Sequence, residues 1–259
     1  MSDELLIERR EGIVFVTLNR PQARNALTFP MYEGLATLAA EASADEAVKA
    51  IVITGAGEKA FAAGTDISQF TSFRSAEDAL AYEARIDRVL SALEDCPKPT
   101  IAAIAGACTG GGAAIAAVCD LRLGAANARF GFPIAKTLGN TLSMANHARL
   151  VALLGPARVA DLIFTARLMD AEEMKAAGLL SEVLPDHAAL QARAAELAAT
   201  VAGHAPLTLR ATKMALKRLR APLRAVQGDD LVAMCFTSRD FQEGVEAFLA
   251  RRPAVWQGR

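Results

Sequence analysis

Two short loops rich in glycine and alanine contain the residue types that could do chemistry in this chain. Residues 109–114 read TGGGAA and lie between an apolar run and the start of a predicted helix. Glycines let the backbone approach a ligand closely, and the free N–H groups at a helix start attract negative charge. One tight turn would not need three consecutive glycines, so we expect a ligand site. No Gly-Lys-Ser/Thr follows, which excludes a P-loop.

The second loop is residues 61–67, FAAGTDI, which follow the apolar run 51–54. If each loop directs one backbone N–H at the same oxygen, the pair forms an oxyanion hole. Each such donor can contribute roughly 3 kcal/mol of transition-state stabilisation. The sequence shows the two loops but does not show that they converge.

A third glycine pattern, GAGEKA at residues 55–60, matches the dinucleotide fingerprint G-x-G-x-x-A. We reject that interpretation because FAAG follows at the point where the long helix of a dinucleotide fold should begin. No second strand ending in an acidic residue follows either. A nicotinamide dehydrogenase is therefore a remote alternative.

A few polar residues could act on a substrate. His147 lies four residues after Ser143 on a predicted helix, and a Ser–His pair would indicate acyl transfer, although a lone helical His is more often packed or solvated. Asn140, beside Gly139, could orient a water or bind a carbonyl, but turns and caps account for most such residues. Asp66 could contact substrate, and capping of the next helix is the commoner role.

Composition excludes several classes of protein. The 259 residues are 53% hydrophobic and carry 28 basic and 29 acidic side chains, so no nucleic-acid or membrane partner is expected. The basic stretch 210–224 lacks interleaved aromatics and is typical of a solvated helix face; contacts to ligand phosphates, from Lys213 and Lys217, are an alternative. The four cysteines show no C-x-x-C spacing, so we expect no metal. The chain shows no signal-like or membrane-length apolar run, which favours a cytoplasmic enzyme.

Strand–loop–helix units recur along the first two-thirds of the chain and predict an α/β fold. Strands are expected at residues 5–9, 13–18, 50–54, 100–105, 121–123 and 128–130. Helices are expected at residues 28–41, 75–93 and 113–118, with Ser75 as a candidate N-cap. From residue 143 onward the pattern predicts almost only helix.

Several long motifs resemble the enoyl-CoA hydratase/isomerase, or crotonase, family. They are LNRPQARNAL at 18–27, ITGAGEKAFAAGTDI at 53–67, AGACTGGGAAIAAVCDLRL at 105–123 and ARFGFP at 128–133, with further matches at 153–185, 205–216 and 241–259. The resemblance runs in order over nearly the whole chain. It implies a crotonase-like spiral of ββα units in residues 1–200 and a C-terminal helical trimerisation region in residues 201–259. It also implies a homotrimer or a dimer of trimers.

The resemblance further implies that an acyl-coenzyme A thioester is the substrate and that no other cofactor is needed. By motif position, the thioester oxygen would accept backbone N–H bonds from Thr65 and Gly111. Thr65 is a departure, because Ala or Gly is more usual there. The implied substrate and coenzyme A contacts are Arg24, Ala26, Ala63, Thr65, Asp66, Ile67, Gly110, Gly111 and Pro133.

The larger departure concerns proton transfer. The family's hydratases use two glutamates, and the matching positions here hold Ala114 and either Ile134 or Ala135. None of these can move a proton, whereas water addition needs a pair of carboxylates. We therefore expect an acyl-CoA enzyme that stabilises a thioester enolate, with Asn140 or His147 as candidate replacements. The alternatives are a decarboxylase, a thioester hydrolase, an isomerase or a catalytically silent coenzyme A-binding scaffold.

Overall fold

Two β-sheets form the centre of the molecule in the computed structural model, which describes residues 3–71, 73 and 75–259. The larger sheet has the strand order β1-β2-β3-β5-β7-β10 and the smaller one β4-β6-β8-β9. The larger sheet comprises β1 (Leu5–Arg10), β2 (Ile13–Leu18), β3 (Ala50–Gly55), β5 (Thr100–Ile104), β7 (Leu121–Ala125) and β10 (Glu182–Leu184). The smaller sheet comprises β4 (Ala60–Ala62), β6 (Ala107–Thr109), β8 (Arg129–Gly131) and β9 (Met169–Asp170). This α/β arrangement is the spiral predicted from the sequence.

The chain repeatedly sends one strand to each sheet and then forms a helix. β3 and β4 precede α2, β5 and β6 precede α3, and β7 and β8 precede α4. Pairing is parallel within both sheets except for β1 with β2 and β8 with β9. Because β4, β6 and β8 are parallel neighbours, the loops that follow them leave from the same edge of the small sheet.

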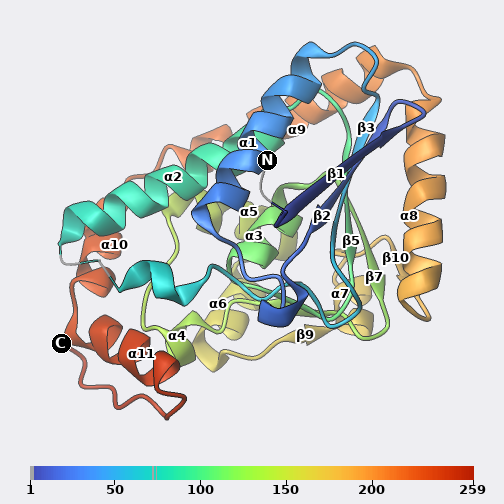
Figure 1. Ribbon diagram of the computed structural model, residues 1–259. Coiled ribbons are helices and arrows are strands. Elements are labelled where there is room, and N and C mark those ends of the chain that lie inside the picture. Colours follow the sequence, from blue (N-terminus) through green and yellow to red (C-terminus); the bar gives the residue numbers. More distant parts are fainter. Residues whose placement is uncertain (1–2, 72, 74) are drawn as a thin grey trace.

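Helices cover both faces of the larger sheet (Figure 1). They are α1 (Phe29–Ala44), α2 (Ala76–Asp95), α3 (Gly111–Val118), α4 (Ile134–Thr137), α5 (Met144–Leu154), α6 (Pro156–Thr165), α7 (Ala171–Ala176), α8 (His187–Ala202), α9 (Pro206–Arg224), α10 (Asp229–Phe236) and α11 (Arg239–Leu249), with 3-10 helices η1 (Pro21–Ala23) and η2 (Ile67–Phe70). Successive side chains of β3 point to opposite faces of the larger sheet. Val52 packs in the hydrophobic cluster with α8, and Ile53 packs in the main core with α1 to α3.

Most predicted elements are confirmed, and the errors have a common cause. The prediction of almost only helix after residue 143 is wrong, because β9 and β10 lie there and β10 completes the larger sheet. The strands β4 and β6 were not predicted. Each of these four strands has only two or three residues, too few for a period-2 pattern to stand out. The cap of α2 is confirmed: Ser75 and Asp78 form a reciprocal capping box.

Within the described part of the chain, no helix combines the length and the apolar character that crossing a membrane requires. The C-terminal helices instead pack on the core: α9 contacts α5, α10 contacts α2, and α11 contacts η2 and α4.

A buried arginine joins α5 to α2. The Arg149 side chain is 1% exposed and lies 3.1 Å from a carboxylate oxygen of Asp87 and 3.3 Å from one of Glu94. It also donates to Asn146 and Ser91. Removing one partner of a buried ion pair leaves the other charge uncompensated, which is more costly than losing an exposed pair.

We expect Arg149→Met to lower the free energy of unfolding by about 3 kcal/mol, measured by urea denaturation. The matched control is Arg9→Met. Arg9 contacts two carboxylates, Glu41 at 3.2 Å and Asp45 at 3.3 Å, but is well exposed. Its replacement should therefore cost less than about 1 kcal/mol. Equal losses for the two variants would contradict the role given to burial.

Candidate functional site

An open cavity of about 890 Å³ lies where the loops after β4, β6 and β8 meet. The parallel pairing of Ala62 with Cys108 and of Thr109 with Gly131 sets these loops side by side. The N–H of Gly110 donates to the carbonyl of Gly131 at 3.1 Å, which ties the second loop to the third. The glycine-rich loops singled out in the sequence therefore do converge.

The turn at residues 24–27 forms one wall and is held by a buried asparagine. Asn25 is fully buried and has a φ of 54°, a left-handed conformation that Asn tolerates better than most residues. Its side-chain amide donates to the carbonyls of Ala56 and Ala60, and its oxygen accepts from Arg20 N–H. The Ala63 N–H donates to the Arg24 carbonyl at 3.0 Å. The turn and the loop after β4 thus form one unit.

The backbone N–H groups of two residues on facing loops, Thr65 and Gly111, have no acceptor among the described residues. One belongs to Thr65, whose neighbours Gly64 and Asp66 instead make the bonds to Leu27. The other belongs to Gly111, the first residue of α3, where an N–H has no intrahelical acceptor. Both residues line the cavity. Such a pair of free donors can bind an oxygen that gains negative charge.

Gly111 is held close to a buried cluster of hydroxyl groups. A Cβ on Gly111 would lie 2.0 Å from the Tyr32 hydroxyl and 3.1 Å from Thr65 Oγ1. The Thr65 hydroxyl lies 2.9 Å from the hydroxyl of Tyr32 and 2.9 Å from that of Tyr82. The pKa values of both tyrosines are raised by burial. This cluster gives the unusual threonine a role: its side chain joins α1 and α2 behind the donor loop.

The two positions that match the missing glutamates do face the cavity. Ala114 on α3 and Ile134 at the start of α4 both line it and are buried. Ala135 is exposed and is not among the lining residues, so Ile134 is the relevant position. Neither side chain can exchange a proton.

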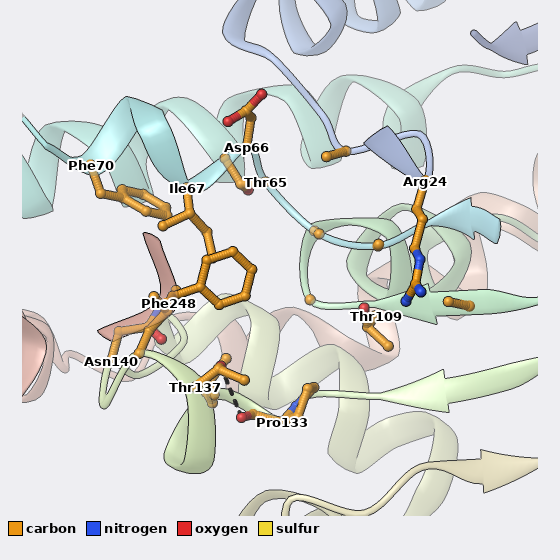
Figure 2. Close-up of a pocket in the computed structure, with 18 of the residues that line it drawn as sticks. Arg24, Thr65, Asp66, Ile67, Phe70, Thr109, Pro133, Thr137, Asn140 and Phe248 are labelled. Atoms are coloured by element: carbon orange, nitrogen blue, oxygen red, sulfur yellow. Dashed lines mark hydrogen bonds between the residues drawn. The ribbon is translucent and has the colours of Figure 1, made fainter. Parts of the chain in front are cut away.

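Most of the candidate site residues lie together. Those that line the cavity are Arg24, Ala26, Ala63, Thr65, Asp66, Ile67, Gly110, Gly111, Pro133 and Asn140. Figure 2 shows Arg24 toward one end and Ile67, Phe70 and Phe248 gathered near Asn140 at the other. The second end is therefore apolar. The Asn140 side-chain oxygen is buried there with no hydrogen-bond partner among the described residues.

The structure does not place His147 in this group. It is absent from the cavity lining, and burial lowers its pKa. The Ser143 hydroxyl accepts from Asn146 N–H as the N-cap of α5, so a Ser143–His147 nucleophile pair is not formed. Residues four apart share a helix face, but here the cap position directs the serine side chain along the backbone.

Three other charged residues have partners within the chain. Asp66 caps η2 by accepting from Ser68 and lies 2.9 Å from Arg20. Burial alone would raise the pKa of Asp66, but these hydrogen bonds outweigh it and lower the pKa. Lys213 contacts Asp120 at 2.7 Å and Lys217 pairs with Asp95, so these lysines have partners within the chain, and the ligand-phosphate alternative stays a prediction.

Sequence reasoning missed one ionisable group, Glu83 of α2. This side chain is 7% exposed, lines the cavity and accepts one hydrogen bond, from Ser143 N–H to Oε2 at 3.1 Å. Burial, assisted by repulsion from Asp87, raises the pKa of Glu83 to about 8. The sequence did hold a signal: Glu83 shares the spacing of Ala79 and Ile86, which are buried on the same helix face.

Comparison with known proteins agrees with this geometry. The family model described as enoyl-CoA hydratase/isomerase matches residues 8–259. The chain belongs to the enoyl-CoA hydratase/isomerase family. It is 33% identical to the short-chain-enoyl-CoA hydratase of Clostridium acetobutylicum, over 96% of each chain. It is 34% identical to the 2,3-dehydroadipyl-CoA hydratase of Escherichia coli, over 99% of each chain.

Solved structures of this family have the same fold. The crystal structure of an enoyl-CoA hydratase/carnithine racemase from Magnetospirillum magneticum matches with a TM-score of 0.81 and 37% identity, over 100% of this chain and 97% of that chain. Pseudomonas aeruginosa OdaA matches with a TM-score of 0.83 and 31% identity, over 96% and 99%. Membership of the enoyl-CoA hydratase/isomerase family thus holds for both sequence and fold.

Proposed function

We propose that this member of the enoyl-CoA hydratase/isomerase family binds an acyl-coenzyme A thioester in the cavity and stabilises the enolate formed from it. The observation that carries the proposal is the pair of unbonded N–H groups of Thr65 and Gly111 at one cavity. An enolate oxygen carries the negative charge that such donors bind most strongly. The apolar end near Phe70 would take the acyl group, and the coenzyme A moiety would lie along residues 24–27.

The loss of both usual acid/base positions to Ala114 and Ile134 makes hydration the question to test first. Purified protein is mixed with crotonyl-CoA, and the enoyl absorbance and free thiol are followed together. Loss of absorbance without thiol would mean hydration, and release of thiol would mean thioester hydrolysis. If neither signal changes while crotonyl-CoA binds, the reaction is another one on the same thioester. If crotonyl-CoA does not bind at all, the proposal fails.

We also propose that the chain assembles as a homotrimer or a dimer of trimers. Large apolar side chains are exposed along the C-terminal helices, including Leu207, Leu219 and Met234. Exposed apolar patches of this kind mark contact surfaces between proteins. Size-exclusion chromatography with light scattering tests this directly. A monomer of 27.3 kDa at micromolar concentration would contradict it.

A further inference from the structure

Two carboxylic acids, Asp66 and Glu83, are present among the described residues that line the cavity. Asp66 is occupied by Arg20 and by the backbone of η2. Glu83 is less constrained, because its Oε2 accepts from Ser143 and no described residue bonds to Oε1. One oxygen of Glu83 is therefore available to a ligand in the cavity.

Glu83 also lies near the two N–H donors. The Glu83 charge acts on Tyr32 and on Tyr82, and it raises the pKa of both. The Tyr32 hydroxyl occupies the space into which a Gly111 Cβ would project, and it is bonded to Thr65. Glu83 lines the same cavity as Thr65 and Gly111, and it follows Tyr82, whose hydroxyl lies 2.9 Å from Thr65 Oγ1.

The neighbouring helix α3 brings no charge to this part of the cavity. α2, which carries Glu83, packs on α3, and α3 consists only of small and aliphatic residues from Gly111 to Val118. Ala114 of that helix faces the cavity, so no competing charge stands there.

We propose that Glu83 is the proton-transfer group of this cavity, whose Oε1 exchanges a proton with the α-carbon of the bound thioester. This inference rests on the proposed function, because it requires the enolate oxygen to be held by Thr65 and Gly111. When the enolate collapses, its C=C electron pair forms a Cα–H bond with the Glu83 proton. The O–H bond of the Glu83 carboxyl group breaks, and its electron pair stays on the carboxylate. The enolate oxygen re-forms the thioester C=O bond, and the Glu83 carboxylate then takes a proton from water.

The protonation state of Glu83 suits this role. A pKa of about 8 keeps the carboxyl group neutral at pH 7, ready to donate, and leaves a basic fraction that grows with pH. The groups that bear on it are Asp87 and Tyr82 from α2 and Tyr32 from α1, and Arg149 of α5 pairs with Asp87. α3 contributes no titratable side chain at this point, and α10 presents Phe236 to Tyr82.

A reaction that needs only one donor would match this site. In decarboxylation the departing carbon dioxide leaves the enolate electron pair behind, so one proton completes the reaction. Water addition needs a second group to activate water, and Asp66 is already committed to Arg20.

The test is α-proton exchange, which needs no knowledge of the natural acyl group. The protein is incubated with butyryl-CoA in deuterium oxide, and deuterium at the α-carbon is followed by NMR. We expect exchange that becomes faster as the pH rises through about 8, since the carboxylate form removes the proton. Glu83→Gln should lower the rate by about 10²- to 10⁴-fold, and Glu83→Asp should restore part of it.

The control is Glu77→Gln, an exposed carboxylate on the same helix, which should exchange at the parent rate. Glutamine at position 83 has the same shape and can still accept from Ser143, so folding should persist; butyryl-CoA binding by calorimetry checks this. Exchange that survives Glu83→Gln would overturn the inference and leave the proposed function standing. Binding of butyryl-CoA without exchange in the parent would also overturn it. A parent that does not bind butyryl-CoA would overturn the proposed function itself.

Discussion

Proline at position 111 should slow α-proton exchange into butyryl-CoA by about 10²- to 10³-fold relative to alanine at the same position, both in a Tyr32→Phe background. Proline and alanine both add a Cβ, but only proline lacks the N–H. The Tyr32→Phe change removes the hydroxyl that lies 2.0 Å from the Cβ position, and the remaining neighbours, Thr65 Oγ1 at 3.1 Å and Leu27 Cδ1 at 3.2 Å, must shift equally for alanine and proline. Position 111 is the first residue of α3, where proline fits the helical backbone.

The same comparison contains its own checks. Gly111→Ala in the parent, with Tyr32 intact, should already lose activity because the Cβ pushes the donor out of place. Circular dichroism and butyryl-CoA binding show whether the Gly111→Ala protein is still folded, and so distinguish displacement of the donor from unfolding. Equal exchange rates for the proline and alanine double variants would show that the Gly111 N–H does not bind the enolate oxygen.

Glu83→Gln should make the protein much more stable than the parent at pH 8, and the difference should shrink to less than about 1 kcal/mol at pH 5. The pKa of Glu83 is raised from 4.5 to about 8 in the folded protein. Between pH 4.5 and about pH 8, the Glu83 carboxyl group is mostly ionised in the unfolded chain but keeps its proton in the folded chain. The parent therefore loses stability as pH rises through this window, and the loss is complete above the folded pKa. Glutamine does not ionise, so the Glu83→Gln protein does not lose stability over this pH range.

The expected difference in the free energy of unfolding is about 3 to 5 kcal/mol at pH 8, which follows from a shift of that size at about 1.4 kcal/mol per pH unit. Urea denaturation at pH 5, 6, 7 and 8 measures it. The control is Glu77→Gln on the same helix, which removes an exposed first-turn carboxylate and should lower the free energy of unfolding by less than about 1 kcal/mol, with no gain in stability at pH 8. A Glu83→Gln difference that stays constant with pH would mean that Glu83 is already ionised in the folded state.

A stability gain from losing Glu83 would also support its catalytic role. A buried carboxyl group that weakens the fold at neutral pH has to be retained for another reason, and strongly shifted groups gather at functional sites. The two experiments on Glu83 are independent, since one follows exchange at the thioester and the other follows unfolding without ligand.

The sequence by itself determined the longer helices and strands and the site loops. The apolar run of β3, the Ser75 cap of α2 and the glycine-rich loops at residues 61–67 and 109–114 were all readable, because each depends on residues near one another in the chain. The absence of glutamate at positions 114 and 134 was equally plain. The family resemblance then located Thr65 and Gly111.

Only the tertiary structure decided which of these groups meet. The pairing of β4 with β6, two strands too short to predict, brings the Thr65 and Gly111 loops together across more than forty residues of chain. His147 was a candidate from its spacing to Ser143, but it is not among the residues that line the cavity, whereas its neighbour Asn146 on α5 is. Glu83 was passed over as one more charge on an amphipathic helix. Burial in the folded chain removes water from the carboxyl group, and this loss of water, assisted by repulsion from Asp87, raises the pKa of Glu83.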